Sequence, residues 1–529
     1  MCANLKQISF VAFLMQLRNL ILIILFICET TLSYRILGIC PTPAKSHQMF
    51  FHTIMGALAD NGHELVLLTT DPFETNNPNI TQIDWSESYQ SDFANTNWKE
   101  MDSLKVIKLG LHDAPGILDD SLSHLDVVSL IKNYQNEHFD AVIAEYIGNT
   151  PMYAFAELFN APLIGFNSLE IDAYQHEIVG NAMHPVLHSP NMFGYYSGDT
   201  LFKRVCNTLW YLIGKVLYKV FDTMFNNLIH KHFGARIKSN SVELTKSVDL
   251  LLTSSSPFLG FTRPTVAFTV PIPFLHIKPR LQPLPEKLNK FLNAAHDGAI
   301  YFSFGTMVKL NNNKDEMISK FLNAFKDMPY KVLMKNNLIL NSNDTNKIMT
   351  SNWFPQQEVL AHKNIKLFIT QGGLPSIQES VYYGIPLIVV PFLADQFDNA
   401  AIVEEKGIGK AINAKDLSVA TIKKTIKELI QNPKYKQNVL NLSQVVKDEQ
   451  VSPRAKAVWW IEFTIRNRNM MKHLKYKGVE LSFVQTYFID VILVFLIIFL
   501  VLIFITKKLL KSIKEKIGII KISIKWKRA

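Results

Sequence analysis

The stretch from Trp353 to Asn399 combines residue types that together can hold a phosphorylated ligand. Branched and aromatic residues at Ile365–Thr370 predict a buried parallel strand. Gly372 and Gly373 follow directly, and they permit a tight turn and a close approach of a ligand to the main chain. A helix is expected to start at Pro375, where its free N–H groups and its dipole attract an anion. The pattern therefore predicts a diphosphate site where the strand, the glycine turn and the helix meet.

Polar and aromatic side chains are placed to complete this site. Ser376 and Glu379 are three residues apart and share one helix face, so Ser376 suits a phosphate oxygen and Glu379 suits ribose hydroxyls. Trp353 can stack on a flat base. A second strand delivers Asp395 and Gln396 to a loop at the carboxyl edge of the sheet, where ligands of α/β proteins bind. Each residue also has a purely structural interpretation, such as a plain turn, packing for the tryptophan or an N-cap for the aspartate.

A candidate acid–base pair lies in the N-terminal half. A strand is predicted at Arg35–Cys40, and His47 follows it where a loop meets a helix expected at Gln48–Asn61. With an ordinary pKa near 6.5, a histidine at this place suits a general base. Glu145 emerges from the predicted strand Phe139–Gly148 and can orient the imidazole and stabilise its charged form. The alternatives are a structural histidine and a solvated carboxylate.

These motifs closely resemble the UDP-glycosyltransferases. The residues on which this resemblance rests are Gln371-Gly372-Gly373, the helix with Glu379, Gly384-Ile385-Pro386, Asp395-Gln396 and the Ser46-His47 pair. The resemblance extends to the strand Asp297–Met307 and to Ala457–Arg466, a late helix that in the family packs back across the domains, and it covers roughly residues 34 to 510.

The resemblance implies a role for each motif residue. Trp353 and Gln356 would face the uracil and ribose, and Glu379 the ribose. Thr306, Gly373 and Ser376 would lie at the diphosphate, and Asp395 and Gln396 at the transferred sugar. Two positions depart from the commonest form of the family. Gln371 replaces a histidine beside the diphosphate, keeping an N–H donor but never becoming cationic. Pro273-Phe274 replaces a Gly-Gly pair, so the domain connection is expected to bend differently.

The fold expected from these elements is α/β, with two Rossmann-like domains that face each other across a cleft (GT-B type) and a C-terminal transmembrane helix. The predicted boundaries are residues 34–275 for the N-terminal acceptor-binding domain and 276–470 for the C-terminal UDP-sugar-binding domain. A signal peptide is expected at 1–33, a transmembrane helix at 487–506 and a basic cytosolic tail at 507–529.

Charge follows this organisation. The tail after Thr506 holds eight Lys and one Arg against one Glu, which supplies +8 of the net +10 of the chain. The positive charge is therefore concentrated in the tail and does not indicate a nucleic-acid-binding face. Lys507 and Lys508 directly after the apolar run predict a type I protein with its body in the lumen. Lys525 and Lys527 resemble a dilysine retrieval signal, which would keep the protein in the endoplasmic reticulum membrane.

Sequons at Asn79, Asn343 and Asn441 are expected in lumenal surface loops. Cys40 and Cys206 are too few for a disulfide framework, and a bridge between them is not inferred. The segment Thr200–Phe233 is rich in large apolar residues with interspersed Lys, and it predicts either core helices or a lipid-facing patch near the acceptor entrance.

The resulting prediction is an enzyme that moves glucose or glucuronate from a UDP-sugar to a hydroxyl of a small lipophilic acceptor, with inversion to a β-glycoside. The UDP-sugar is a substrate, no permanently bound cofactor or metal is expected, and a homo-oligomer is left open. The alternative is a non-catalytic carrier of lipophilic ligands on the same fold, favoured only by Gln371 and the altered domain connection.

Overall fold

The computed structural model describes residues 33–91, 105, 108–186, 199–260, 262–306, 308, 316–336, 346–393 and 395–526, the last nine of these by their backbone alone. The chain divides into a body that ends at Lys475 and a C-terminal unit that starts at Tyr476. The predicted signal peptide, apart from Ser33, and Asn343 lie outside the described residues.

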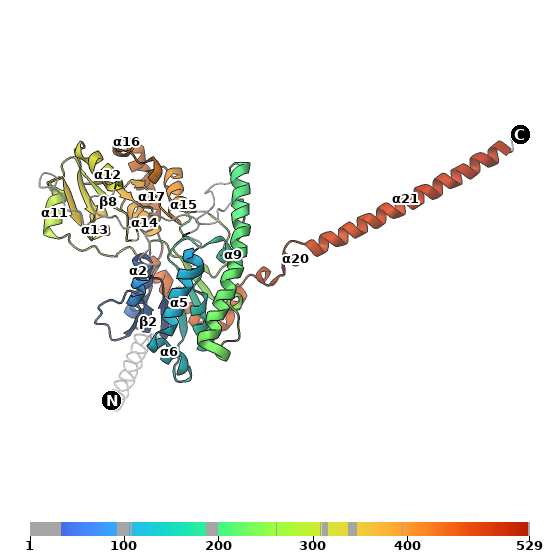
Figure 1. Ribbon diagram of the computed structural model, residues 1–529, viewed down its shortest axis with the longest axis horizontal. Coiled ribbons are helices and arrows are strands. Elements are labelled where there is room, and N and C mark those ends of the chain that lie inside the picture. Colours follow the sequence, from blue (N-terminus) through green and yellow to red (C-terminus); the bar gives the residue numbers. More distant parts are fainter. Residues whose placement is uncertain are drawn as a thin grey trace, which may run out of the picture. The chain divides into compact units, whose positions relative to one another are not determined.

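The body is built on two parallel β-sheets with helices packed on them (Figure 1). The first sheet has the strand order β3-β2-β1-β4-β5-β6-β7. Its strands are β1 Arg35–Cys40, β2 Glu64–Thr69, β3 Ile80–Asp84, β4 Ala141–Glu145, β5 Leu163–Asn167, β6 Leu250–Thr253 and β7 Thr269–Pro271. Its helices are α2 Lys45–Asp60, α5 Ala114–Ser123, α6 Leu125–Lys132, α7 Thr150–Leu158, α8 Ala173–Ile178, α9 Leu201–Phe233 and α10 Ser241–Lys246.

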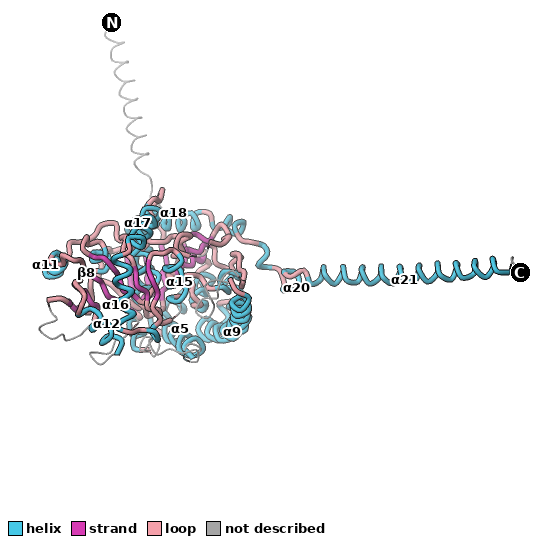
Figure 2. Tube along the Cα trace, turned by 90° about the horizontal axis from the view of Figure 1, so that it is seen from above, coloured by secondary structure: helices cyan, strands magenta, loops and turns pink. Residues whose placement is uncertain are grey.

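The second sheet has the order β10-β9-β8-β11-β12-β13. Its strands are β8 Ala299–Ser303, β9 Lys331–Lys335, β10 Ile348–Ser351, β11 Ile365–Thr370, β12 Leu387–Val389 and β13 Gly409–Ala411. Its helices are α11 Glu286–Asn293, α12 Glu316–Lys326, α13 Gln356–Leu360, α14 Leu374–Tyr382, α15 Gln396–Glu405, α16 Val419–Gln431 and α17 Pro433–Lys447. In Figure 2 the strands lie inside a shell of helices. The predicted α/β class is confirmed.

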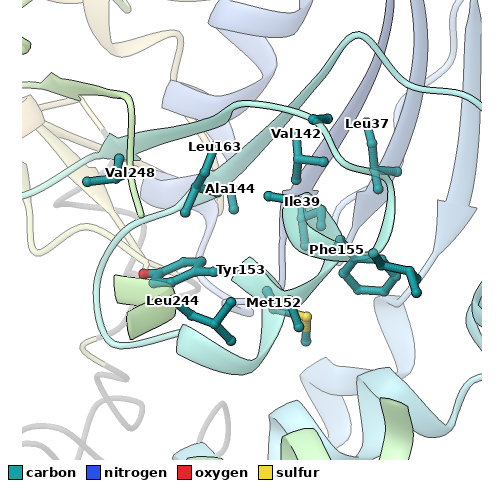
Figure 3. Close-up of a cluster of buried hydrophobic side chains, with 14 of the residues drawn as sticks. Leu37, Ile39, Val142, Ala144, Met152, Tyr153, Phe155, Leu163, Leu244 and Val248 are labelled. Carbon is teal, nitrogen blue, oxygen red and sulfur yellow. The ribbon is translucent and has the colours of Figure 1, made fainter. Parts of the chain in front are cut away.

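Successive side chains of each strand point to opposite faces of its sheet, and apolar side chains form a buried core on both faces. In β1, Leu37 and Ile39 belong to one buried cluster, while Ile36 and Cys40 belong to the cluster on the opposite face. Figure 3 shows the first of these clusters, with β-strand side chains such as Val142 meeting helix residues. Because both faces are covered, the strands read as nearly continuous apolar runs.

The chain passes between the two sheets twice, and the two crossings are bonded to each other. After β7 the chain turns at Phe274, whose φ of +59° is a left-handed conformation that glycine adopts more easily. The return crossing leads into α18, Pro453–Arg466, which packs on α2 of the first sheet. Lys456 Nζ donates to Pro271 O at 2.9 Å, and the Arg454 guanidinium donates to main-chain oxygens just after the first crossing.

The remaining helices are α19 Arg468–Met471, α20 Phe483–Thr486 and α21 Ile489–Trp526. Within the described part of the chain, Ile489–Ile517 is the one helix long and apolar enough to cross a membrane, with a mean hydropathy of 3.3. The helix starts later than the predicted span, because Tyr487 and Phe488 precede it, and it continues past Thr506 into the basic segment.

Candidate active site

His47 and Glu145 form a close pair in the first sheet. The Nδ1 atom of His47 lies 2.6 Å from Oε1 of Glu145, and the carboxylate also accepts from Thr42 Oγ1 at 2.5 Å and from Asn149 Nδ2 at 3.0 Å. Glu145 is fully buried, and an ionised carboxylate is a pure acceptor. His47 therefore donates its Nδ1–H, which leaves Nε2 as the basic atom of the ring.

Local folding explains how two residues so distant in sequence meet. β1 and β4 are neighbours in the sheet, with Ile39 opposite Ala144. Glu145 ends β4, while α2 starts just beyond β1 at Lys45, earlier than the sequence predicts. His47 thus sits in the first turn of α2 instead of the preceding loop, at the same carboxyl edge as Glu145.

The glycine turn after β11 has the backbone that the sequence pattern predicts. Gly372 has a φ of +91°, and a Cβ atom there would lie 2.5 Å from Val389 Cγ1. Gly373 is the N-cap of α14, so the free N–H groups of this helix open beside the turn. Ser376 lies in the first turns of α14, and its hydroxyl accepts from Gln356 Nε2 at 3.1 Å.

Glu379 is the centre of a buried amide–carboxylate cluster on α14. Gln356 Nε2 donates to one carboxylate oxygen at 2.6 Å, and Gln357 Nε2 donates to the other at 3.1 Å. Burial raises the pKa of Glu379 to about 7 even though both amides stabilise its charge. The predicted ribose contacts Gln356 and Glu379 are therefore bonded to each other, and Gln357 is a partner that the sequence analysis missed.

Gln371 packs against the turn that carries Thr306. A Cβ atom added to Gly305 would lie 2.6 Å from Gln371 Nε2, so the amide fills the space that only a glycine leaves. Its Oε1 is buried without a hydrogen-bond partner among the described residues. Thr306, the next residue, is exposed. Gln371 and Thr306 thus border the same turn, close to the start of α14.

Replacing Gly305 with alanine should weaken UDP binding and lower the melting temperature. Gly305 has a φ of +68°, so a side chain would strain the backbone by about 1–3 kcal/mol and would displace Gln371. Isothermal titration with UDP and thermal unfolding measure the two effects. Gly56→Ala is the matched control, because Gly56 is in a helix with open space around it and alanine should stabilise it by about 0.5–1 kcal/mol. Equal UDP affinity in both variants would contradict this placement of Gln371.

Trp353 is 61% exposed, and one face of its ring is covered by a lysine that the sequence analysis did not select. Lys335 Nζ lies 4.4 Å from the ring centroid, a cation–π distance. Burial and, to a smaller extent, the positive charge of Lys45 together lower the pKa of Lys335 to about 8. Lys335 ends β9 and Lys45 starts α2, so the two cations bring positive charge from both sheets to the same region.

Asp395 and Gln396 begin α15 and are tied to the glycine turn. Asn399 Nδ2 donates to Asp395 Oδ2 at 2.8 Å and to Gly372 O at 2.9 Å. Gln396 Oε1 accepts from the main-chain N–H groups of Phe392 and Leu393, at 2.8 and 3.1 Å, so this side chain also orders its own loop.

Carboxylates are concentrated at this point. Burial raises the pKa of Asp395 to about 6, although Asn399 and the charge of His47 both lower it. Burial also raises the pKa of Asp398 to about 7, assisted by the negative charges of Asp395 and Glu170. His47 of α2 and Glu170 after β5 belong to the half of the body built on the first sheet, so these charges act between the two halves of the site.

A buried amide on α14 connects the same two halves. Gln378 Nε2 donates to Ser254 O at 2.8 Å, and its Oε1 accepts from Phe274 N at 3.1 Å. Ser254 directly follows β6 of the first sheet. The helix that carries Gly373, Ser376 and Glu379 on one side is therefore fixed to the other sheet through its neighbouring residue.

The predicted glycosylation sites differ in position. Asn79 lies in the turn before β3 and is partly exposed, as a surface loop requires. The loop prediction for Asn441 is wrong, because this residue lies within α17. The sequon hydroxyl of Ser443 is buried and donates to Tyr382 O at 2.6 Å. The spacing of apolar residues in Pro433–Lys447 favours a helix, and here this outweighs the general preference of glycosylation sequons for loops.

The two parallel sheets with their covering helices have the GT-B fold, as in solved glycosyltransferases. The solved complex between a UDP-glucosyltransferase from Polygonum tinctorium capable of glucosylating indoxyl and 3,4-dichloroaniline matches 82% of this chain and 99% of its own, with a TM-score of 0.55 and 15% identity.

Sequence comparison then gives the family. The family model "UDP-glucoronosyl and UDP-glucosyl transferase" matches residues 37–522, and the chain belongs to this family. It is 31% identical to UDP-glycosyltransferase UGT5 of Dactylopius coccus, over 89% of this chain and 91% of the relative. It is 28% identical to UDP-glucuronosyltransferase 2B7 of Homo sapiens, over 88% of this chain and 90% of the relative.

Proposed function

We propose that the protein transfers glucose from UDP-glucose to a hydroxyl group of a small lipophilic acceptor, with inversion at the anomeric carbon. The observation that carries this proposal is the bond of 2.6 Å between His47 and buried Glu145. The charge of His47 also lowers the pKa of Asp395, which supports a base on one half of the body close to the residues predicted to hold the donor sugar on the other.

The proposed reaction is a single displacement. Nε2 of His47 takes the proton of the acceptor hydroxyl, and the resulting imidazolium is stabilised by Glu145. The acceptor oxygen forms a bond to the anomeric carbon as the bond from that carbon to the diphosphate oxygen breaks, and UDP leaves with the electron pair. The N-terminus of α14 and the amide of Gln371 stabilise the growing charge on the diphosphate.

The charge of the sugar region supports glucose over glucuronate. The raised pKa values of Asp395 and Asp398 reflect burial, and that of Asp398 also reflects repulsion from the carboxylates of Asp395 and Glu170. The nearby guanidinium of Arg263 lies 3.7 Å from Glu170, so a carboxylate already accompanies this cation. A glucuronate carboxylate would add a further negative charge, whereas glucose hydroxyls can donate to these carboxylates.

Asp398→Asn should shift donor preference toward UDP-glucuronate. Removing one negative charge from a partly desolvated group is expected to raise the ratio of kcat/KM for UDP-glucuronate over UDP-glucose by about tenfold, near 1.4 kcal/mol. Initial rates with both donors and one phenol measure this ratio. Asp416→Asn, an exposed change in the turn that follows β13, is the control and should leave the ratio unaltered. An unchanged ratio in both variants would remove the electrostatic argument for glucose.

The function itself is tested by incubating the full-length protein in membranes with UDP-glucose or UDP-glucuronate and a panel of phenols. A β-glucoside, recognised from the coupling of its anomeric proton, is the expected product. Lipophilic phenols that bind without turnover of either donor would favour the carrier alternative.

We also propose a type I arrangement in the endoplasmic reticulum. Its support is the candidate span Ile489–Ile517 and the lysines that lie within and after it, starting at Lys507. A body protected from protease in sealed microsomes, with an accessible C-terminus, is the expected result.

A further inference from the structure

The first crossing between the two sheets, residues 272–279, is bonded along its length to the helices of the donor site. Phe274 N donates to Gln378 Oε1 of α14 at 3.1 Å, and Lys278 N donates to Gln357 Oε1 of α13 at 2.9 Å. Between these two bonds lies His276, which is 4% exposed. Both its ring and its carbonyl group reach the helices that carry the predicted ribose contacts.

The ring of His276 faces two acceptors on α14. Nε2 lies 3.3 Å from Pro375 O, in the first turn of the helix, and 3.6 Å from Glu379 Oε1. Burial lowers the pKa of His276 to about 4, so the ring is neutral at neutral pH and carries one N–H. Because both groups that face Nε2 are acceptors, the N–H is on Nε2. It donates to Pro375 O, and its positive end lies beside the carboxylate of Glu379.

Gln357 makes the direct link between the crossing and this carboxylate. Its Nε2 donates to Glu379 Oε1 and to His276 O, each at 3.1 Å. Since its Oε1 accepts from Lys278 N, both ends of the amide are bonded and it cannot turn without losing these bonds. The other carboxylate oxygen accepts from Gln356 Nε2 at 2.6 Å. Two of the roughly four acceptor positions of the carboxylate are therefore occupied, which leaves one on each oxygen for a ligand hydroxyl.

We propose that His276 and Gln357 are positioning residues for the ribose of the donor nucleotide, acting through Glu379. A hydrogen bond weakens steeply as its angle departs from the preferred range, so a carboxylate that accepts from two ribose hydroxyls must be fixed in orientation. The bonds from Gln357 and the N–H of His276 supply that fixation. The inference rests on the proposed function, because the ribose is that of the UDP-sugar.

The same bonds make ribose recognition depend on the position of the crossing. Gln357 is bonded to the main chain of His276 and Lys278 and also to Glu379, so a shift of the crossing would turn the carboxylate. The crossing starts at the end of β7, in the half of the body that carries His47. A nucleotide whose hydroxyls bond the fixed carboxylate in turn favours this position of the crossing.

Binding of UDP and of 2′,3′-dideoxy-UDP to the full chain, measured by isothermal titration, tests this role. The ratio of the two Kd values reports the ribose hydroxyls alone. His276→Asn places its amide near the position of Nδ1 and should lower the ratio about 3- to 10-fold, part of what a hydrogen bond to a charged group contributes. His276→Gln is the matched variant, because its amide reaches the position of Nε2, and it should keep the native ratio. A native ratio in His276→Asn, or an equal loss in both variants, would overturn the role of this N–H.

Further variants distinguish positioning from a general structural effect. Gln357→Met should also lower the ratio, and it provides the test if His276→Asn does not fold. Gln378→Met removes another bond of the crossing without touching Glu379, so it should keep the ratio even where both affinities fall. In Glu379→Gln, the addition of His276→Asn should cause no further decrease. A further decrease in that background would show that His276 acts through another group.

Steady-state rates separate this inference from the proposed function. KM for UDP-glucose should rise several-fold in His276→Asn while kcat stays nearly unchanged, because the base His47 is on the other sheet. A lowered Kd ratio in His276→Asn, without any turnover by the native protein, would refute only the enzyme. Turnover by the native protein, with a native Kd ratio in both His276→Asn and Gln357→Met, would refute only the positioning role.

Discussion

Replacing His47 with alanine should lower kcat for transfer to a phenol by about 10²- to 10⁴-fold, the usual contribution of a positioned general base. KM for the UDP-sugar should change little, because the predicted donor contacts are on the other sheet. The His47 ring is held by a carboxylate that also accepts from Thr42 and Asn149, so the base is fixed before substrate binds. Steady-state rates across a range of donor concentrations separate kcat from KM.

Two further variants make this result specific. Glu145→Gln should also lower kcat by about 10²-fold or more, because an amide no longer stabilises the imidazolium. His52→Ala is the control, since His52 is on the same helix but lies 3.2 Å from Thr69 instead of a carboxylate. A native rate in His47→Ala would show that another group takes the proton.

Replacing Glu379 with glutamine should weaken UDP binding while stabilising the ligand-free protein above pH 7. Hydrogen bonds from ribose to a charged carboxylate contribute about 1.5–3 kcal/mol, so Kd for UDP should rise about 10- to 100-fold. The stability gain follows from the pKa, which burial raises from 4.5 to about 7. Between these two values the unfolded chain loses its proton while the folded protein keeps it, so stability falls as pH rises.

The pKa shift of Glu379 sets both the size of the stability gain in Glu379→Gln and the pH range over which it develops. Below about pH 4.5 the carboxyl is protonated in both states, so the ionisation penalty is absent and the difference in melting temperature between native protein and variant should not depend on pH there. Above about pH 7 the full penalty applies, on the order of 3 kcal/mol. Glu358→Gln should behave oppositely, because its bond with Lys278 lowers the pKa of Glu358 and its charge stabilises the folded state at neutral pH. Thermal unfolding from pH 4 to 8 measures both, and a constant difference for Glu379→Gln would contradict the buried carboxyl.

Local pattern was enough for the elements at the site. The strand Ile365–Thr370, the glycine turn and the helix expected to start at Pro375, which starts one residue earlier, agree with the prediction, since each depends on neighbours in sequence. The pair of His47 and Glu145 was predicted because parallel strands bring their carboxyl ends to one edge of a sheet. The structure adds the distance and the donors from Thr42 and Asn149.

Residues whose position depends on sheet order were missed. Lys335 ends β9 and reaches Trp353 only through the arrangement of β8, β9 and β10, which the sequence does not display. Gln357 looked like the neighbour of a site residue, yet it bonds Glu379 because α13 packs on α14. The sequence did not decide whether the apolar residues of α9 are buried or exposed, because composition alone does not distinguish a core helix from one with an apolar outer face. The core-helix prediction is wrong for the first half of α9, where large aliphatic side chains are exposed.

The paired crossings between the two sheets affect how the sheets can move relative to each other and what happens when a protease cuts the chain between them. Because Lys456 and Arg454 bond the return crossing to the chain around Pro271 and Leu275, both covalent links lie together and act as one hinge. A motion that pulls the two crossings apart would break these bonds, and one that moves α14 away from Ser254 would also break the Gln378 bond. A protease that cuts only one crossing should therefore yield two fragments that separate in a denaturing gel and still elute together under native conditions.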